Sequence, residues 1–408
     1  MAIRCHIIRR PEARCADKKS VPPTPPSPVS VLTAWLLLFF LPQRSRADDR
    51  LDYNYEDYAE NNGRIHVQTQ GAYFGLDLKP WLSVRGNVIS DAIAGATPTG
   101  APPLPGTNAV AMAQMHDHRY AGSVAGDFRL SNHTLSPQFS FSQEDDYRSV
   151  GIALNDAIDF NEKNTTLSAG ISQDFDQVLP NPGEDPSITH PRGKNATDGL
   201  LGISQVLDPN TVLGANATLG YSSGYLSDPY KSVLFDDFPP PPPGLPFTTF
   251  PEKRPRQKFR QVALVSLQHF FEPLHGAVDV SYRFYHDSYG IFAHTAEIQW
   301  NQKIGRHVIL SPFVRYYTQT AASFYGTHFP GDPTNPTVFP TPTYYSADYR
   351  LSALYSWTYG VSLNVKVQKH LSLELAYKRY EMFGTDGITA AAQYPTANVF
   401  SGGLTIWF

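Results

Sequence analysis

Stretches of about ten residues in which apolar and polar side chains alternate recur from Leu51 to the end of the chain. Residues 213–221, 359–367 and 371–377 each carry an apolar residue at every odd position and a small or polar one at every even position. This period of two predicts strands with one face towards an apolar medium and the other towards water. A membrane barrel and a soluble sandwich both produce it, so alternation alone leaves both open.

The connections between these stretches set the number of strands. Seven tight turns of residue types that tolerate turn dihedrals alternate with connections that are mostly longer and more varied. The turns are residues 79–81, 131–133, 161–164, 208–210, 272–275, 305–307 and 369–370. Seven turns join fourteen strands, and further strands at 51–60 and 396–408 make sixteen. An even number, with short turns at the end that holds both termini, is typical of bacterial outer-membrane barrels.

Composition agrees with a barrel and excludes other classes. The mean hydropathy of −0.31 excludes a multi-helix membrane protein, which needs repeated apolar spans of about 20 residues. Charged residues make up 17% and the formal net charge is −4, so no basic surface for nucleic acid is expected.

An apolar run from Val29 to Leu41 precedes a small-x-small pattern, Ser45-Arg46-Ala47. We interpret residues 1–47 as a signal peptide that is cleaved near Ala47, and residues 48–408 as the barrel. Both cysteines, Cys5 and Cys15, fall in the removed segment, so no disulfide or thiolate metal site is expected in the exported chain.

The end of the chain favours the outer membrane over a soluble sandwich. Phe400, Leu404, Ile406 and Phe408 share one face, and the last residue is aromatic. Such a strand is similar to the signal read by the barrel-assembly machinery, which we expect as a partner together with outer-membrane lipid. Aromatic residues near strand ends are expected to form interfacial girdles. They are Trp81, Tyr120, Tyr221, Phe270, Trp300 and Trp407.

Several motifs resemble, in order, those of one protein family. They are GATPTGAPP (95–103), YRFYHDSYGIFAHT (282–295), WNQKIG (300–305), YYSADYRLS (344–352) and AYKRYEMFG (376–384). The family comprises exported bacterial proteins of about this length and is known as a domain of unknown function. The resemblance covers essentially the whole chain after the signal peptide. It implies an outer-membrane barrel, and it implies no activity or functional residues. It also gives a weak link with envelope redox proteins, since family genes often lie near flavin-attachment or thioredoxin-like genes.

Charged and polar residues within the strands are expected to face the interior or a rim, because a charge facing lipid at mid-depth costs about 2–4 kcal/mol. In the segment around residue 283, Tyr282 and Phe284 are expected to face lipid, and Arg283 and Tyr285 the interior. We predict a set of residues that line the lumen or its mouth: Arg283, His286, Asp287, His294, Asp348, Arg350, Lys378 and Glu381.

Metal binding and catalysis receive little support. His116 and His118 share one strand face but lack further ligands for zinc. The acidic clusters Glu144-Asp145-Asp146 and Asp236-Asp237 lack the spacing of a calcium loop. No nucleophile-elbow pattern flanks a serine or histidine. We therefore expect no metal, no cofactor and no enzymatic activity.

The leading functional hypothesis is a channel or porin-like pore for small solutes, because barrels of sixteen or more strands usually leave an aqueous lumen. Long loops such as residues 223–257 could fold inward and narrow it. The alternatives are a non-conducting scaffold that anchors an envelope partner, which could be a redox protein, a membrane enzyme, and a soluble secreted β-protein.

Overall fold

The computed structural model describes residues 49–102, 109–181, 188–240 and 247–408, which belong to one compact unit, Ser45–Phe408. The predicted signal peptide, residues 1–47, lies outside the described residues. Within the described ranges, no helix is long and apolar enough to cross a membrane.

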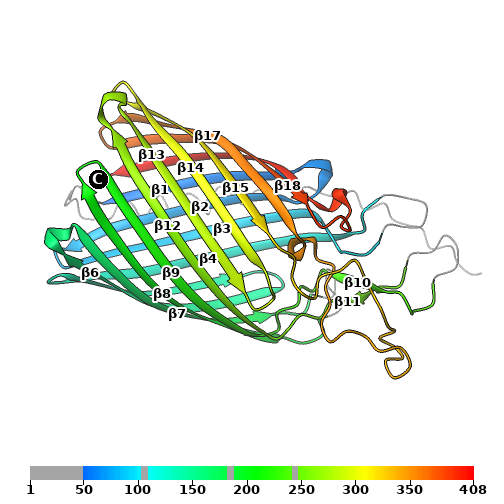
Figure 1. Ribbon diagram of the computed structural model, residues 1–408. Helices are drawn as coiled ribbons and strands as arrows, with labels where there is room; N and C mark the ends of the chain where they lie inside the picture. Colours follow the sequence, from blue (N-terminus) through cyan, green and yellow to red (C-terminus); the bar gives the residue numbers. More distant parts are fainter. Residues whose placement is uncertain (1–48, 103–108, 182–187, 241–246) are drawn as a thin grey trace, which may run out of the picture. The chain divides into compact units, whose positions relative to one another are not determined.

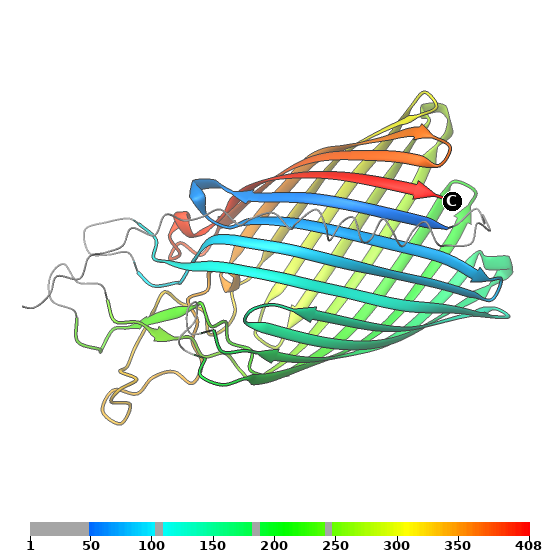
Figure 2. The same cartoon turned by 180° about the vertical axis from the view of Figure 1, so that it is seen from behind.

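Sixteen of the strands in the described residues form a closed antiparallel barrel, as predicted. They are β1 (Arg50–Glu60), β2 (His66–Lys79), β3 (Leu82–Pro98), β4 (Met112–Leu130), β5 (His133–Gln143), β6 (Tyr147–Phe160), β7 (Thr165–Val178), β8 (Arg192–Asp208), β9 (Thr211–Gly224), β12 (Gln257–Phe271), β13 (Gly276–Asp287), β14 (Phe292–Ile304), β15 (Val308–Gln319), β17 (Leu354–Gln368), β18 (Leu371–Gly384) and β19 (Thr396–Trp407). Each strand pairs with its neighbours along the chain. The ring closes where β1 pairs with β19, from Arg50 opposite Trp407 to Glu60 opposite Ala397 (Figures 1 and 2).

The seven predicted tight turns are confirmed, and all lie at the end of the barrel that holds Arg50 and Trp407, here called the turn end. Several turn residues other than glycine adopt the left-handed conformation, among them Ser131, Asn161 and His275. This conformation reverses the chain within a few residues. The opposite end, here called the loop end, carries the longer connections.

The two faces of the wall differ in chemistry. Large apolar residues lie on the outward face, where Leu201 and Leu375 are 67% and 64% exposed. The outward side chains of β19 include Phe400, Leu404 and Ile406, which follow from the register with Leu375 and its neighbours. Two residues expected in the outward girdle, Phe270 and Trp407, instead share the parity of inward residues in β12 and β19. Trp407 lines an inner pocket, because its neighbour across the barrel seam is the inward Arg50.

The inward face of β6 to β9 consists mostly of small residues. Register places these side chains on the same face as Asp198, which is paired with Arg260 across β9. They include Ser149, Gly151, Ala153 and Asn155 on β6, Ser168, Gly170 and Ser172 on β7, Gly202 and Ser204 on β8, and Gly214, Asn216 and Thr218 on β9. Side chains of this size leave the interior beside this arc of the wall unfilled.

A second, small sheet lies at the loop end. β10 (Ser232–Phe235) pairs with β11 (Phe250–Pro251) and, in parallel, with β16 (His328–Phe329) (Figure 1). Phe235 packs on Phe250 and Tyr345, with ring centroids 5.7 and 5.0 Å away. We call the described segments that carry this sheet, residues 225–240, 247–256 and 320–353, the cap. The sequence did not predict this sheet.

The two faces generate a test on adjacent residues of β18, where Leu375 faces outward and Ala376 inward. We expect Leu375→Lys to lower the free energy of unfolding by about 2–4 kcal/mol, because it places a charge in hydrocarbon. Ala376→Lys, which points to the interior, is expected to cost much less. Urea titrations of both variants in lipid vesicles measure the difference, and equal costs would contradict the assignment of the faces.

Candidate functional site

Three of the predicted lining residues face the interior. Arg283 and Asp287 share an inward face of β13, and Lys378 lies on the inward face of β18. The buried Asp287 accepts hydrogen bonds from the backbone N–H of Tyr289 (3.0 Å) and pairs with Lys258 Nζ at 2.9 Å. It therefore anchors the turn between β13 and β14.

Three other predicted lining residues face outward, which corrects the expectation. His286 stacks on Phe292 with ring centroids 4.0 Å apart, and His294 Nδ1 lies 2.7 Å from the hydroxyl of Tyr282. Glu381 pairs with Arg379 at 3.3 Å and sits opposite Trp357. The period of two explains all three, because each residue has the parity of outward aromatic residues on its own or the paired strand.

The remaining two, Asp348 and Arg350, belong to the cap. They flank the short helix η4 (Tyr349–Leu351), and Asp348 caps it by accepting from the backbone N–H of Arg350. The guanidinium of Arg350 contacts both Asp348 and Asp228. Arg254 Nη2 lies 2.8 Å from Asp348 Oδ2. Asp348 is thus held by two arginines, although its side chain is only 1% exposed.

Further buried ionic groups extend this network. Glu252 lies 2.6 Å from Arg254 and accepts a hydrogen bond from the hydroxyl of Ser346. Burial raises the pKa of Glu252 above its usual value, against the opposing effect of Arg254. Burial acts on the pKa of Asp348 in the same direction, but Arg350, Lys231 and Arg254 outweigh it and hold that pKa below the usual range. Asp348 is therefore the stable anionic centre of the cap.

Lys231 ties this centre to the barrel wall. Its ammonium group donates to Thr97 Oγ1 (3.0 Å) and to the carbonyl of Pro98 (2.5 Å), and lies 5.6 Å from the centroid of Tyr349. Burial lowers the pKa of Lys231, while Asp348 opposes the shift. Lys231 enters from the connection between β9 and β12, whereas Thr97 and Pro98 end β3, far around the ring.

The cap contacts loops from other sides of the mouth as well. Tyr230 donates to Asp146 (2.6 Å), in the connection between β5 and β6. Tyr289, between β13 and β14, donates to the carbonyl of Pro255 (3.0 Å). Gly100 has a φ of +91° and lies so close to Ala347 that an added Cβ would be 2.7 Å from its carbonyl oxygen. The cap thus connects segments from several sides of the ring at the loop end.

The residues weighed as metal ligands lie in different places. His116 and His118 face outward on β4, opposite Ala94 and Ala92. Asp117, between them, points inward and approaches Glu144 and Asp146, so that carboxylate oxygens of the three residues lie within 4.8 Å of one another. These three could share a cation. In the other acidic cluster, Asp236 pairs with His328 at 3.1 Å and Asp237 accepts from the backbone N–H of Gly331.

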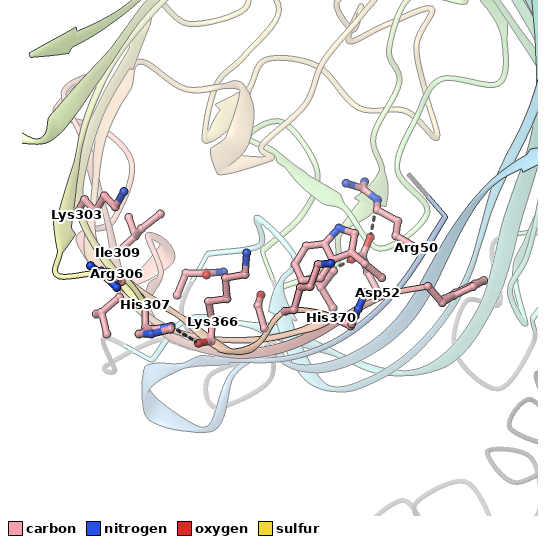
Figure 3. A pocket seen from close by; sticks show the side chains of 15 residues that line it. Arg50, Asp52, Lys303, Arg306, His307, Ile309, Lys366 and His370 are labelled. Atoms are coloured by element: carbon pink, nitrogen blue, oxygen red, sulfur yellow. Dashed lines mark hydrogen bonds and ion pairs between the residues drawn. The ribbon is translucent and has the colours of Figure 1, made fainter. Parts of the chain in front are cut away.

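The turn end carries a basic cavity of about 760 Å³ that the sequence did not predict. It follows the inner wall from β14 through β19 to β1, and Figure 3 shows its side chains along one curve of that wall. Five cationic side chains line it, against the single carboxylate of Asp52: Arg50, Lys303, Arg306, Lys366 and Lys369. We call this cavity the basic basin.

The closed ring, the apolar outward face and the polar inward face define a protein with the fold of outer-membrane β-barrels. The chain belongs to the family described as "Protein of unknown function (DUF3570)", whose profile matches residues 39–400. The comparison with curated proteins finds no match.

Solved structures with similar folds are outer-membrane proteins of several kinds. CdiB from Acinetobacter baumannii is 9% identical, with a TM-score of 0.50 over 88% of this chain and 60% of its own. A bacterial polysaccharide outer membrane secretin is 10% identical, with a TM-score of 0.46 over 88% and 98%. The siderophore receptor PirA from Pseudomonas aeruginosa is 10% identical, with a TM-score of 0.42 over 89% and 62%. The chain thus spans less than two thirds of CdiB and PirA, and at these identities the likeness concerns the fold alone.

The carboxylates at Glu144 generate a pH-dependent prediction. Burial, with a smaller contribution from Asp117, raises the pKa of Glu144 from 4.5 to about 7. The folded protein therefore binds this proton more tightly than the unfolded chain, and its stability from this group falls as pH rises from about 4.5 to 7. We expect Glu144→Gln to flatten the stability profile over that range. Urea titrations from pH 5 to 8 measure it, and an unchanged slope in the variant would contradict the assignment.

Proposed function

We propose that the protein is an outer-membrane pore for small solutes, with its turn end towards the periplasm and the cap over the outer mouth. The observation that carries the proposal is the inward face of β6 to β9, where residues such as Gly170, Ser172 and Gly202 leave the interior unfilled. A sixteen-stranded ring is wide enough for an aqueous lumen when its interior is not occupied. Polar side chains along it keep such a lumen hydrated.

The cap supplies a restriction at one end of this pore. Its ionic network is expensive to bury and is stable only while each charge keeps its partners. Asp348 has the central place, because Arg254 and Arg350 both bind it and Lys231 lies near enough to influence its charge. The cap is therefore expected to move as one body and to loosen when this carboxylate is lost.

A non-conducting scaffold is the alternative that the sequence left open. A scaffold needs only the wall and an outer or inner docking face, and gains nothing from a wide interior lined by small polar side chains. The structure offers this lining over four neighbouring strands. The geometry therefore supports a pore better than a scaffold.

The proposal is tested by single-channel recording in planar bilayers. We expect the refolded protein to conduct and Asp348→Asn to conduct more, because loss of one partner from a buried network costs about 3–5 kcal/mol and frees the cap. Asp236→Asn is the matched control: it removes a carboxylate of the same cap from an exposed pair, worth about 0–1 kcal/mol. A folded barrel that never conducts would refute the pore, and equal conductance in both variants would refute the role of the cap.

A further inference from the structure

The basic basin differs from the wall beside it in how its charges are balanced. In the neighbouring pocket at the same end, Arg85 pairs with Asp127 at 2.9 Å and Arg129 with Asp77 at 3.3 Å. In the basin, Arg50 pairs with Asp52 at 3.2 Å. Among the described residues, no ion pair joins a carboxylate to any of the other four cations: Lys303, Arg306, Lys366 and Lys369. The wall therefore neutralises its arginines on one side and leaves positive charge exposed on the other.

The positions of these cations follow from the strand pattern. Lys303 and Lys366 occupy inward positions near the turn ends of β14 and β17. Arg306 and Lys369 lie in the tight turns that follow those strands. Two neighbouring hairpins thus present their charges to one space, and Figure 3 shows Lys303, Arg306 and Lys366 on the same stretch of wall.

We propose that the basic basin is a binding site for small soluble anions that carry two or more negative charges, such as phosphate-bearing solutes, and that it makes the pore anion-selective. This rests on the proposed function. Unpaired cations on a concave, low-dielectric wall concentrate counter-ions, and Lys or Arg groups at a constriction select anions and phosphates in pores.

The size of the basin suits weak binding. A volume of about 760 Å³ has room for about 25 water molecules at about 30 Å³ each. A small anion can therefore be held with much of its hydration shell in place, by charge rather than by a closed set of hydrogen bonds. Such a site favours entry yet allows release, as conduction requires.

The test is the ratio of chloride to potassium permeability, from the reversal potential across a neutral phosphatidylcholine bilayer in a KCl gradient. We expect the wild-type ratio to exceed one. In Lys303→Gln/Lys366→Gln it is expected to fall about fivefold or more, the factor that one unit charge at about 4 Å is worth in bulk water. Pyrophosphate added at the turn end is expected to block chloride current in the wild type and much less in the variant.

The matched control is Lys79→Gln/Lys163→Gln, which removes two cations from the same end of the barrel outside the basin. A conducting channel that prefers potassium, or one whose selectivity falls equally in both double variants, would overturn the basin while the pore stands. If no channel conducts, the pore is refuted, and binding of radiolabelled pyrophosphate to the detergent-solubilised barrel decides the basin. Binding that Lys303→Gln/Lys366→Gln abolishes supports it, and absence of binding overturns it.

Discussion

Every backbone N–H and C=O within a bilayer must find a partner in the protein, since an unpaired group costs several kcal/mol in hydrocarbon. The chain meets this constraint by pairing its first and last barrel strands, β1 and β19, over their whole length from Arg50 to Glu60. Closure fixes which residues face in and which face out, because parity carries around the ring through the register. The inner face must then be polar or small, and it is this face that bears the proposed function.

The two ends of the ring handle charge differently. At the loop end the charges are buried and therefore mutually paired, with Asp348 between Arg254 and Arg350. This pairing holds segments from several sides of the ring together over the mouth. At the turn end, water reaches the cations of the basic basin, so Lys303 and Lys366 need no carboxylate partners. The pore that we propose thus has a mechanical restriction at one end and an electrostatic one at the other.

Much of the barrel could be predicted from the sequence because its determinants are local. Turn residues and period-two stripes gave the sixteen strands, the seven turns and the long connections at the other end. The same parity places His286, His294 and Glu381 outward with Tyr282 and Trp357, so their predicted lining role ignored a signal that the sequence contains. The cap was out of reach, because Lys231 meets Thr97 and Pro98 across the mouth and no local pattern records such a contact. The basin was missed for a related reason: Lys303 and Lys366 are distant in sequence and adjacent only after β14, β15 and β17 pair.

The account depends most on a lumen that contains water. Reaction of single cysteines with a small, water-soluble maleimide in lipid vesicles tests this most directly, with Ser172→Cys on the inward face of β7 and Ile171→Cys beside it on the outward face. We predict fast labelling of residue 172 and little labelling of residue 171, measured at each site by mass spectrometry. Equal protection of both cysteines in the folded barrel would show that the interior is filled, and would contradict the pore.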